Sequence, residues 1–185
     1  PDGSAIELRK ALAESNSLNM DNIICGNGSD EILSLFANCF AGEGDEIVYS
    51  EHGFLVYPIA TKAAGATPVV AKEKKYKADV EEIINVCSKK TKVCFIANPN
   101  NPTGTYLNRN QLITLRKKLP KSCLLVIDSA YAEYVEKDDY TSGFELVNKF
   151  NNVACTRTFS KIYGLAALRI GWAYASLEVI DYLNR

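Results

Sequence analysis

The chain has 185 residues, of which 47% are hydrophobic and 23% are charged, and its formal net charge is −1. This length is sufficient for one substantial hydrophobic core, and the composition is that of an ordinary globular protein. The near-neutral charge gives no reason to expect binding to nucleic acid or to an anionic membrane surface, and no apolar run approaches the ~20 residues of a membrane-spanning helix.

The first part of the chain predicts a helix, a short strand and a second helix. Residues 1–15 begin with turn residues and then place four apolar residues near one helical face, namely Ile6, Leu8, Ala11 and Leu12. A brief strand is expected at 22–25, followed by the polar turn 26–31. The helix after this turn is apolar on most sides, so we expect it to be largely buried.

Strand and helix patterns alternate through the rest of the chain. Strands are predicted at 46–50, 67–71, 93–97, 123–127 and 153–155. Helices are predicted at 54–64, 78–87 and 108–119, the second of them opened by Asp79. Continuous apolar strands that alternate with helices are typical of a mostly parallel sheet covered on both faces, which is a three-layer αβα fold of the α/β class.

Residues with useful chemistry follow several of these strands. Ser29 and Asp30 follow the first strand, Asn101 follows the strand 93–97, and Asp128 follows the strand 123–127. Ligands of such sheets bind at the carboxyl ends of the strands. We therefore expect these residues to share one site with Lys161.

The turn after the last predicted strand suggests the kind of ligand. We expect a polar turn from Thr156 that contains Lys161, flanked by the hydroxyls of Thr158 and Ser160, with Arg169 eight residues beyond the lysine. This combination suits pyridoxal phosphate, whose aldehyde forms a Schiff base with a lysine and whose phosphate accepts hydrogen bonds from hydroxyl and guanidinium groups. We expect Lys161 to be buried beside Arg169, conditions that favour its neutral amine. The alternative is a solvated lysine at a turn.

Other positions fit the same cofactor. The glycines of Gly26-Asn27-Gly28 permit close approach of an anion to the helix start at Ser29 and Asp30. The segment is not a dinucleotide-binding fingerprint, because Glu31 stands where the third glycine of that motif belongs. Ser29 or Asp30 can equally be a simple helix cap.

The polar residues after the two central strands have matching partners on the cofactor ring. Asp128 ends a run of five apolar residues and suits the protonated nitrogen of a pyridine ring. Tyr131 and Asn101 are candidates for the 3-oxygen, and Phe54 for stacking on the ring face. Each has an ordinary structural alternative: a capping aspartate, a core tyrosine, a turn asparagine and a core phenylalanine. His52 is the only histidine, and we do not expect it to be the catalytic base, because the freed lysine moves the proton in this chemistry.

The six cysteines lack CxxC spacing, and four of them fall in apolar runs: Cys25, Cys94, Cys123 and Cys155. This pattern favours buried thiols in a reducing compartment over disulfides or a metal site, so we expect a cytoplasmic protein without a metal.

Four motifs, in order along the chain, resemble those of the fold-type I aminotransferases that use pyridoxal phosphate, and most closely those of the histidinol-phosphate aminotransferases. They are GNGSDE (26–31), NPNNPTG (98–104), VIDSAY (126–131) and RTFSKIYGLAALRIGW (157–172). Ile162 departs from the small residue that often follows the lysine in this family. The resemblance implies that Lys161 is the Schiff-base lysine, that Asp128 pairs with the pyridine nitrogen, and that Tyr131 and Asn101 bind the 3-oxygen. It implies a stacking role for Phe54 and a phosphate site made by the following groups: the amides of Ser29 and Asp30, the hydroxyl of Thr158 or Ser160, and Arg169.

The resemblance also sets expectations for the whole protein. Members of the family are much longer, so we expect residues 1–185 to be the cofactor-binding large domain, without the N-terminal arm and the C-terminal small domain. The implied reaction is amino transfer between glutamate and the histidinol-phosphate pair in histidine biosynthesis, carried out by a homodimer on small-molecule substrates. Three alternatives remain: an aromatic amino-acid aminotransferase, a threonine-phosphate decarboxylase, and a folded domain that is inactive by itself.

Overall fold

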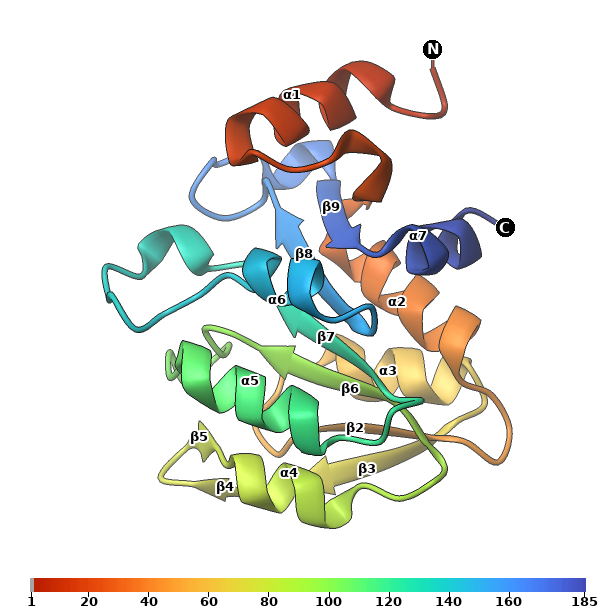
Figure 1. Cartoon of the computed structure of the whole chain (residues 1–185), viewed down its shortest axis with the longest axis vertical. Helices are drawn as coiled ribbons and strands as arrows, with labels where there is room; N and C mark the ends of the chain where they lie inside the picture. The colour runs from red at the N-terminus through yellow and green to blue at the C-terminus, as the bar shows by residue number, and fades with distance from the viewer. Residues whose placement is uncertain (1) are drawn as a thin grey trace.

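The computed structural model describes residues 2–185 and contains a seven-stranded sheet with helices on both faces (Figure 1). The strands of this sheet are β1 (Ile23–Asn27), β2 (Glu46–Ser50), β3 (Thr67–Ala71), β6 (Thr91–Ala97), β7 (Leu124–Asp128), β8 (Val153–Thr158) and β9 (Ile170–Ala175). A small hairpin of β4 (Glu73–Lys74) and β5 (Lys77–Ala78) follows β3. Within the described residues, no helix is both long enough and apolar enough to cross a membrane.

The order of strands across the sheet is β1-β9-β8-β7-β6-β2-β3. The five strands from β8 to β3 pair in parallel, whereas β9 runs antiparallel to both of its neighbours. The mostly parallel sheet predicted from the alternating pattern is therefore confirmed. Its parallel strands bring their carboxyl ends to a common edge, as such sheets do.

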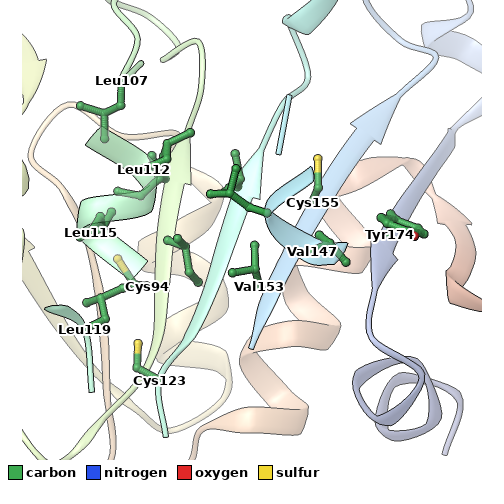
Figure 2. Packing of buried hydrophobic residues seen from close by; sticks show 14 of the residues in the cluster. Cys94, Leu107, Leu112, Leu115, Leu119, Cys123, Val147, Val153, Cys155 and Tyr174 are labelled. Atoms are coloured by element: carbon green, nitrogen blue, oxygen red, sulfur yellow. The ribbon is translucent and has the colours of Figure 1, made fainter. Parts of the chain in front are cut away.

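Each face of the sheet has its own core. One face is covered by α1 (Ile6–Asn16), α4 (Val80–Val86), α5 (Arg109–Lys118) and α6 (Phe144–Lys149), and the other by α2 (Gly28–Phe40), α3 (Val56–Ala63) and α7 (Leu177–Asn184). Residues 2–185 also contain three short 3-10 helices: η1 (Met20–Asn22), η2 (Ala132–Tyr134) and η3 (Ala166–Leu168). Figure 2 shows part of the first core, where Leu112 and Leu115 of α5 join Cys94 of β6 and Cys155 of β8. The layers are thus αβα.

Two helices begin where their capping residues predict. The Asp79 carboxylate accepts the backbone N–H groups of Glu81 and Glu82 at the start of α4. Asn108 and Gln111 form a reciprocal capping box at the start of α5. In both cases the side chain satisfies amides that the helix itself leaves unpaired.

The predicted turn at Thr156 was wrong, because β8 continues to Thr158. Strand β7 pairs with β8 as far as Thr156, and β9 pairs with its other edge from Ala154 to Thr158. Hydrogen bonding on both edges keeps the polar residues extended, and threonine is favoured in strands. The apolar residues that follow Arg169 form the partner strand β9, which the sequence pattern did not reveal.

The apolar face predicted for the first helix is only partly buried. Leu12 is buried, Ile6 and Ala11 are exposed, and Ala13 is buried instead. Helix α1 packs next to β1 at the edge of the sheet, so a narrow stripe of it is covered. None of the six cysteines forms a disulfide, and Cys94, Cys123 and Cys155 are buried.

Candidate functional site

A pocket at the carboxyl edge of the sheet contains every residue proposed for the site from the sequence. It lies where β1, β6, β7 and β8 end and where α2 and α3 begin. The ten residues are Ser29, Asp30, Phe54, Asn101, Asp128, Tyr131, Thr158, Ser160, Lys161 and Arg169, and the remaining lining residues are Ala97, Pro99, Ala130 and Ala166. The side chains come together as expected, whereas the role of each remains a prediction.

The start of α2 is shaped by two glycines that admit Arg169. A Cβ atom on Gly28, whose φ is 79°, would stand 2.6 Å from Nη2 of Arg169. A Cβ atom on Gly171 would stand 2.3 Å from the backbone of Gly28 and Ser29. A side chain at Gly28 would displace the guanidinium, and a side chain at Gly171 would displace the first residues of α2. The glycines therefore create a place where a helix N-terminus and an arginine face the same anion.

Arg169 is held over this helix start by several weak contacts. Its Nη1 donates to the carbonyl oxygen of Ala166 at 3.1 Å and lies 3.5 Å from Oγ of Ser160. Its Nη2 is 3.7 Å from the Asp30 carboxylate, and both side chains are about half exposed. Only the contact to Ala166 has ordinary hydrogen-bond length, so the guanidinium keeps donors available for a ligand.

Glu31 has a structural role in the turn that precedes α2. Its carboxylate accepts the backbone N–H of Asn27 at 2.7 Å and the Asn27 side-chain amide at 3.1 Å. Helix α2 itself has no side-chain cap, so its first amides remain available to a ligand.

Asp128 is a buried carboxylate that two hydroxyl groups hold in place. Tyr57 donates to its Oδ2 and Thr156 to its Oδ1, each at 2.9 Å, and the residue is 4% exposed. Burial raises the pKa of Asp128, and these two hydrogen bonds oppose that rise. Nearby charges have smaller effects on the same pKa, which Asp30 raises and Lys161 lowers.

Tyr57 and Thr156 were not recognised from the sequence. Tyr57 is 1% exposed, stacks on Phe95 with ring centroids 5.0 Å apart, and meets the edge of Phe54 at 6.0 Å. The only sequence signal was the helix predicted from residue 54, in which residues three positions apart share one side. In the structure α3 begins at Val56, and Phe54 meets the Tyr57 ring from the preceding loop. Thr156 was missed because it was assigned to a turn.

Lys161 is exposed, which contradicts the expectation that it is buried. Its Nζ lies 5.3 Å from the centre of the Tyr131 ring, and the residues from Lys161 to Arg169 are all exposed. This segment leaves the sheet after β8, turns and forms η3 before the chain returns as β9. No other element of the described chain packs over it, so the lysine reaches the pocket from an open rim.

Asn101 belongs to a loop that its neighbours fix. The Asn98 side chain both accepts from the backbone N–H of Leu107 and donates to its carbonyl oxygen, at 2.7 and 3.1 Å. These two hydrogen bonds close the loop at its base and present Asn101 to the pocket. His52, in contrast, does not line the pocket.

The comparisons with known proteins identify the family of the chain. The sequence model of the family described as aminotransferase class I and II matches residues 1–185. The chain is 51% identical to a histidinol-phosphate aminotransferase of Rhodospirillum centenum and 49% identical to one of Maricaulis maris. Both alignments cover the whole chain and 51% of the relative, so the chain spans about half the length of these relatives.

Solved structures show the same fold. The crystal structure of histidinol-phosphate aminotransferase from Sinorhizobium meliloti in complex with pyridoxal-5'-phosphate superposes with a TM-score of 0.93 at 27% identity, over all of this chain and 50% of that one. L-threonine-O-3-phosphate decarboxylase from Porphyromonas gingivalis gives a TM-score of 0.83 at 23% identity, covering all of this chain and 53% of that one, a likeness of fold alone.

Proposed function

We propose that this chain, which belongs to the aminotransferase class I and II family, is the cofactor-binding domain of a pyridoxal-phosphate-dependent aminotransferase. The observation that carries this proposal is the convergence of Lys161, Asp128 and Arg169 in one pocket at the edge of the sheet. Pyridoxal phosphate, when bound, supplies an aldehyde that bonds to amines and a protonated ring that withdraws electrons from the bonds to the α-carbon of an amino acid.

The phosphate end of the pocket fits the chemistry of that group. Gly28 leaves space for the Arg169 guanidinium where a Cβ atom would collide with it. We assign the phosphate to this guanidinium, to the amides of Ser29 and Asp30 at the start of α2, and to the hydroxyl groups of Thr158 or Ser160. In this arrangement the Asp30 carboxylate keeps Arg169 close to the helix start.

The ring end of the pocket fits equally well. Asp128 is a buried carboxylate whose two hydrogen-bond donors are neutral hydroxyl groups, so it has the capacity to accept a further N–H from a cationic ring. We assign it to the pyridine nitrogen, Phe54 to the face of the ring, and Tyr131 and Asn101 to the 3-oxygen. Lys161 would hold the cofactor through its aldehyde, and its Nζ would serve as the group that moves the proton at the α-carbon of the substrate.

The proposed substrates follow from the relatives rather than from the pocket. Relatives with this function are about half identical to the chain over its whole length. We therefore propose amino transfer between glutamate and the histidinol-phosphate pair, as a step of histidine biosynthesis. The likeness to the decarboxylase concerns the fold alone and gives that alternative no support. Product analysis, keto acid against carbon dioxide, separates the two reactions.

We further propose that residues 1–185 are the large domain of a longer protein that forms a homodimer. Supporting evidence comes from the rim of the pocket, where four apolar side chains are exposed between 40% and 60%: Ile162, Tyr163, Leu165 and Leu168. An apolar patch of this kind beside a site is typical of a surface that another domain or subunit covers. The unpaired cysteines are consistent with a cytoplasmic location.

The covalent bond to Lys161 provides the test. Purified full-length protein is incubated with pyridoxal phosphate, treated with borohydride and analysed by absorbance and peptide mass. We expect the cofactor to be trapped on the peptide that contains Lys161, in the wild type and in Lys62→Ala, which removes an exposed lysine outside the pocket. Lys161→Ala should abolish trapping. Equal trapping in wild type and Lys161→Ala would refute the assignment.

A further inference from the structure

His52, the only histidine of the chain, lies outside the pocket in the loop between β2 and α3 that also carries Phe54. Its backbone N–H donates to Oε1 of Glu73 at 3.1 Å, and its ring Nδ1 is 3.0 Å from Oε2 of the same carboxylate. The Glu73 side chain is only 1% exposed. Both oxygens of a buried carboxyl group are thus contacted by one residue, and an ionised Glu73 accepts the second contact when Nδ1 carries the proton.

The same residue also connects to the second loop of the pocket. The carbonyl oxygen of His52 accepts the side-chain amide of Asn100 at 3.0 Å. Asn100 is 6% exposed and pairs through its backbone N–H with the carbonyl oxygen of Thr105 at 2.7 Å. The next residue is Asn101, which lines the pocket. One histidine therefore links the Phe54 loop to the Asn101 loop.

The β4–β5 hairpin completes this connection. Glu73 begins β4, and the ring of Tyr76 at the hairpin turn packs against His52 with ring centroids 5.3 Å apart. The carbonyl oxygen of Tyr76 accepts the hydroxyl of Thr105 at 3.1 Å. The hairpin holds both loops from outside the pocket, and no atom of it lines the pocket.

Two features make this arrangement stiff. A buried carboxylate is costly unless it is hydrogen-bonded, and within residues 2–185 its hydrogen-bond donors are the two N–H groups of His52. A Cβ atom on Gly53 would stand 2.9 Å from the carbonyl oxygen of Ser50, so the loop is compact between His52 and Phe54. A displacement of His52 would therefore also displace the Phe54 ring.

We propose that His52 and Glu73 are positioning residues that fix Phe54 and Asn101 for the cofactor, with His52 acting through its Nδ1 hydrogen bond and not through proton transfer. This inference rests on the proposed function, in which Phe54 stacks on the cofactor ring and Asn101 binds its 3-oxygen.

Two substitutions of His52 separate these roles. His52→Asn places an amide N–H near the position of Nδ1, so it retains the bond to Glu73 while it loses any acid–base function. His52→Gln places its amide further out and loses that bond. Glu73→Gln and Glu73→Ala form a second pair, because glutamine can still accept the backbone N–H and donate to the ring in its other tautomer, whereas alanine can do neither. The second pair carries the test if His52→Gln does not fold.

The measurements use full-length protein with pyridoxal phosphate. Cofactor affinity comes from absorbance titration, the orientation of the bound ring from its induced circular dichroism, and fold integrity from a thermal melt without cofactor. We expect His52→Gln and Glu73→Ala to weaken affinity by about 10-fold or more and to change the induced signal, as misplaced site residues do. His52→Asn and Glu73→Gln should stay within about threefold of wild type in affinity, far from the loss that misplacement causes.

The outcomes are distinct. Unchanged affinity and induced signal in His52→Gln and Glu73→Ala, including the case in which only their melting temperature falls, would overturn the positioning role. Equal losses in His52→Asn and His52→Gln would overturn it too, since they would point to the ring itself. If wild-type protein fails to trap cofactor on Lys161, the proposed function fails first, and the inference fails with it.

Discussion

Replacing Tyr57 by phenylalanine removes one hydroxyl group from the buried side of the pocket and leaves the ring in place. The hydroxyl donates to Oδ2 of Asp128 at 2.9 Å, and the ring is fixed by stacking on Phe95 with an interplanar angle of 5°. After the substitution, Thr156 is the remaining side-chain donor to Asp128 within the described residues. The change therefore isolates one hydrogen bond to a buried charge.

The expected magnitude follows from the charge on that carboxylate. A hydrogen bond to a charged group contributes about 1.5–3 kcal/mol, and Tyr57 and Asp128 are both buried, so solvent does not replace it. Burial raises the pKa of Asp128, and the bond from Tyr57 opposes that rise, so Tyr57→Phe raises this pKa further. A raised pKa in the folded state means that the ionised form is penalised, and stability increases as the pH falls through the raised value. The stability lost in Tyr57→Phe should therefore be full at neutral pH and shrink as the solution becomes acidic enough to protonate Asp128.

Urea unfolding of the protein without cofactor, at neutral and at acidic pH, measures this difference. Tyr49→Phe is the matched control, because Tyr49 packs beside Tyr57 with ring centroids 6.2 Å apart and does not bond to Asp128. We expect Tyr57→Phe to lower the free energy of unfolding by about 1.5–3 kcal/mol at neutral pH and by less at acidic pH. The variant should also bind pyridoxal phosphate more weakly. A loss equal to that of Tyr49→Phe, or one that does not depend on pH, would refute the reasoning.

Two further substitutions probe the framework of the site. Gly171→Ala forces a Cβ atom to within 2.3 Å of backbone atoms of Gly28 and Ser29. We expect this to displace the phosphate end of the pocket and to lower cofactor affinity at least tenfold in an absorbance titration. Gly42→Ala, whose Cβ would have no atom within 4 Å, should match wild type in the same titration. Arg116→Met removes a buried guanidinium that donates to several carbonyl oxygens. Each buried acceptor left unpaired costs about 1–3 kcal/mol, so urea unfolding should show a loss of more than ~2 kcal/mol in the free energy of unfolding. Arg116→Lys should lose less stability. An Arg116→Met variant as stable as the wild type would contradict this account. The carbonyl oxygens belong to Leu119, Pro120, Cys123 and Asn152.

The sequence predicted most of the site because the chemistry of the site is concentrated at strand ends. An apolar run that stops at a carboxylate, as at Asp128, marks both a strand and its carboxyl end. Parallel strands bring those ends to one edge, so the sequence predicts that Ser29, Asn101 and Lys161 share a pocket, and all three line it. The helix starts are predictable because capping is local: Asp79 and Asn108 accept backbone N–H groups no more than three residues further along the chain.

What the sequence did not predict depends on contacts between distant residues. Tyr57 meets Asp128 across 71 positions and His52 meets Glu73 across 21, and neither pair has a periodic or local signal. The exposure of Lys161 was missed for a related reason. Whether a turn is covered depends on which other elements pack over it, and in residues 2–185 none covers the segment from Lys161 to Arg169.

Strand β8 shows why a small error at an element boundary conceals functional residues. In a strand, alternate side chains point to opposite faces. Extending β8 to Thr158 places Thr156 and Thr158 on the face of Asp128 and the pocket, whereas Arg157 points to the other face. There Arg157 pairs with Glu133 and lies over the rings of Phe144 and Trp172.

Glu133 lies in η2, two residues after Tyr131. Its ion pair with Arg157 therefore fastens the Tyr131 segment to the strand that leads to Lys161, from the side of the sheet away from the pocket. A turn at Thr156 would have given these residues no defined direction. Because β9 holds β8 extended from its other edge, Thr156 and Thr158 point to the face of Asp128, and Arg157 between them anchors the neighbouring loop from the opposite face.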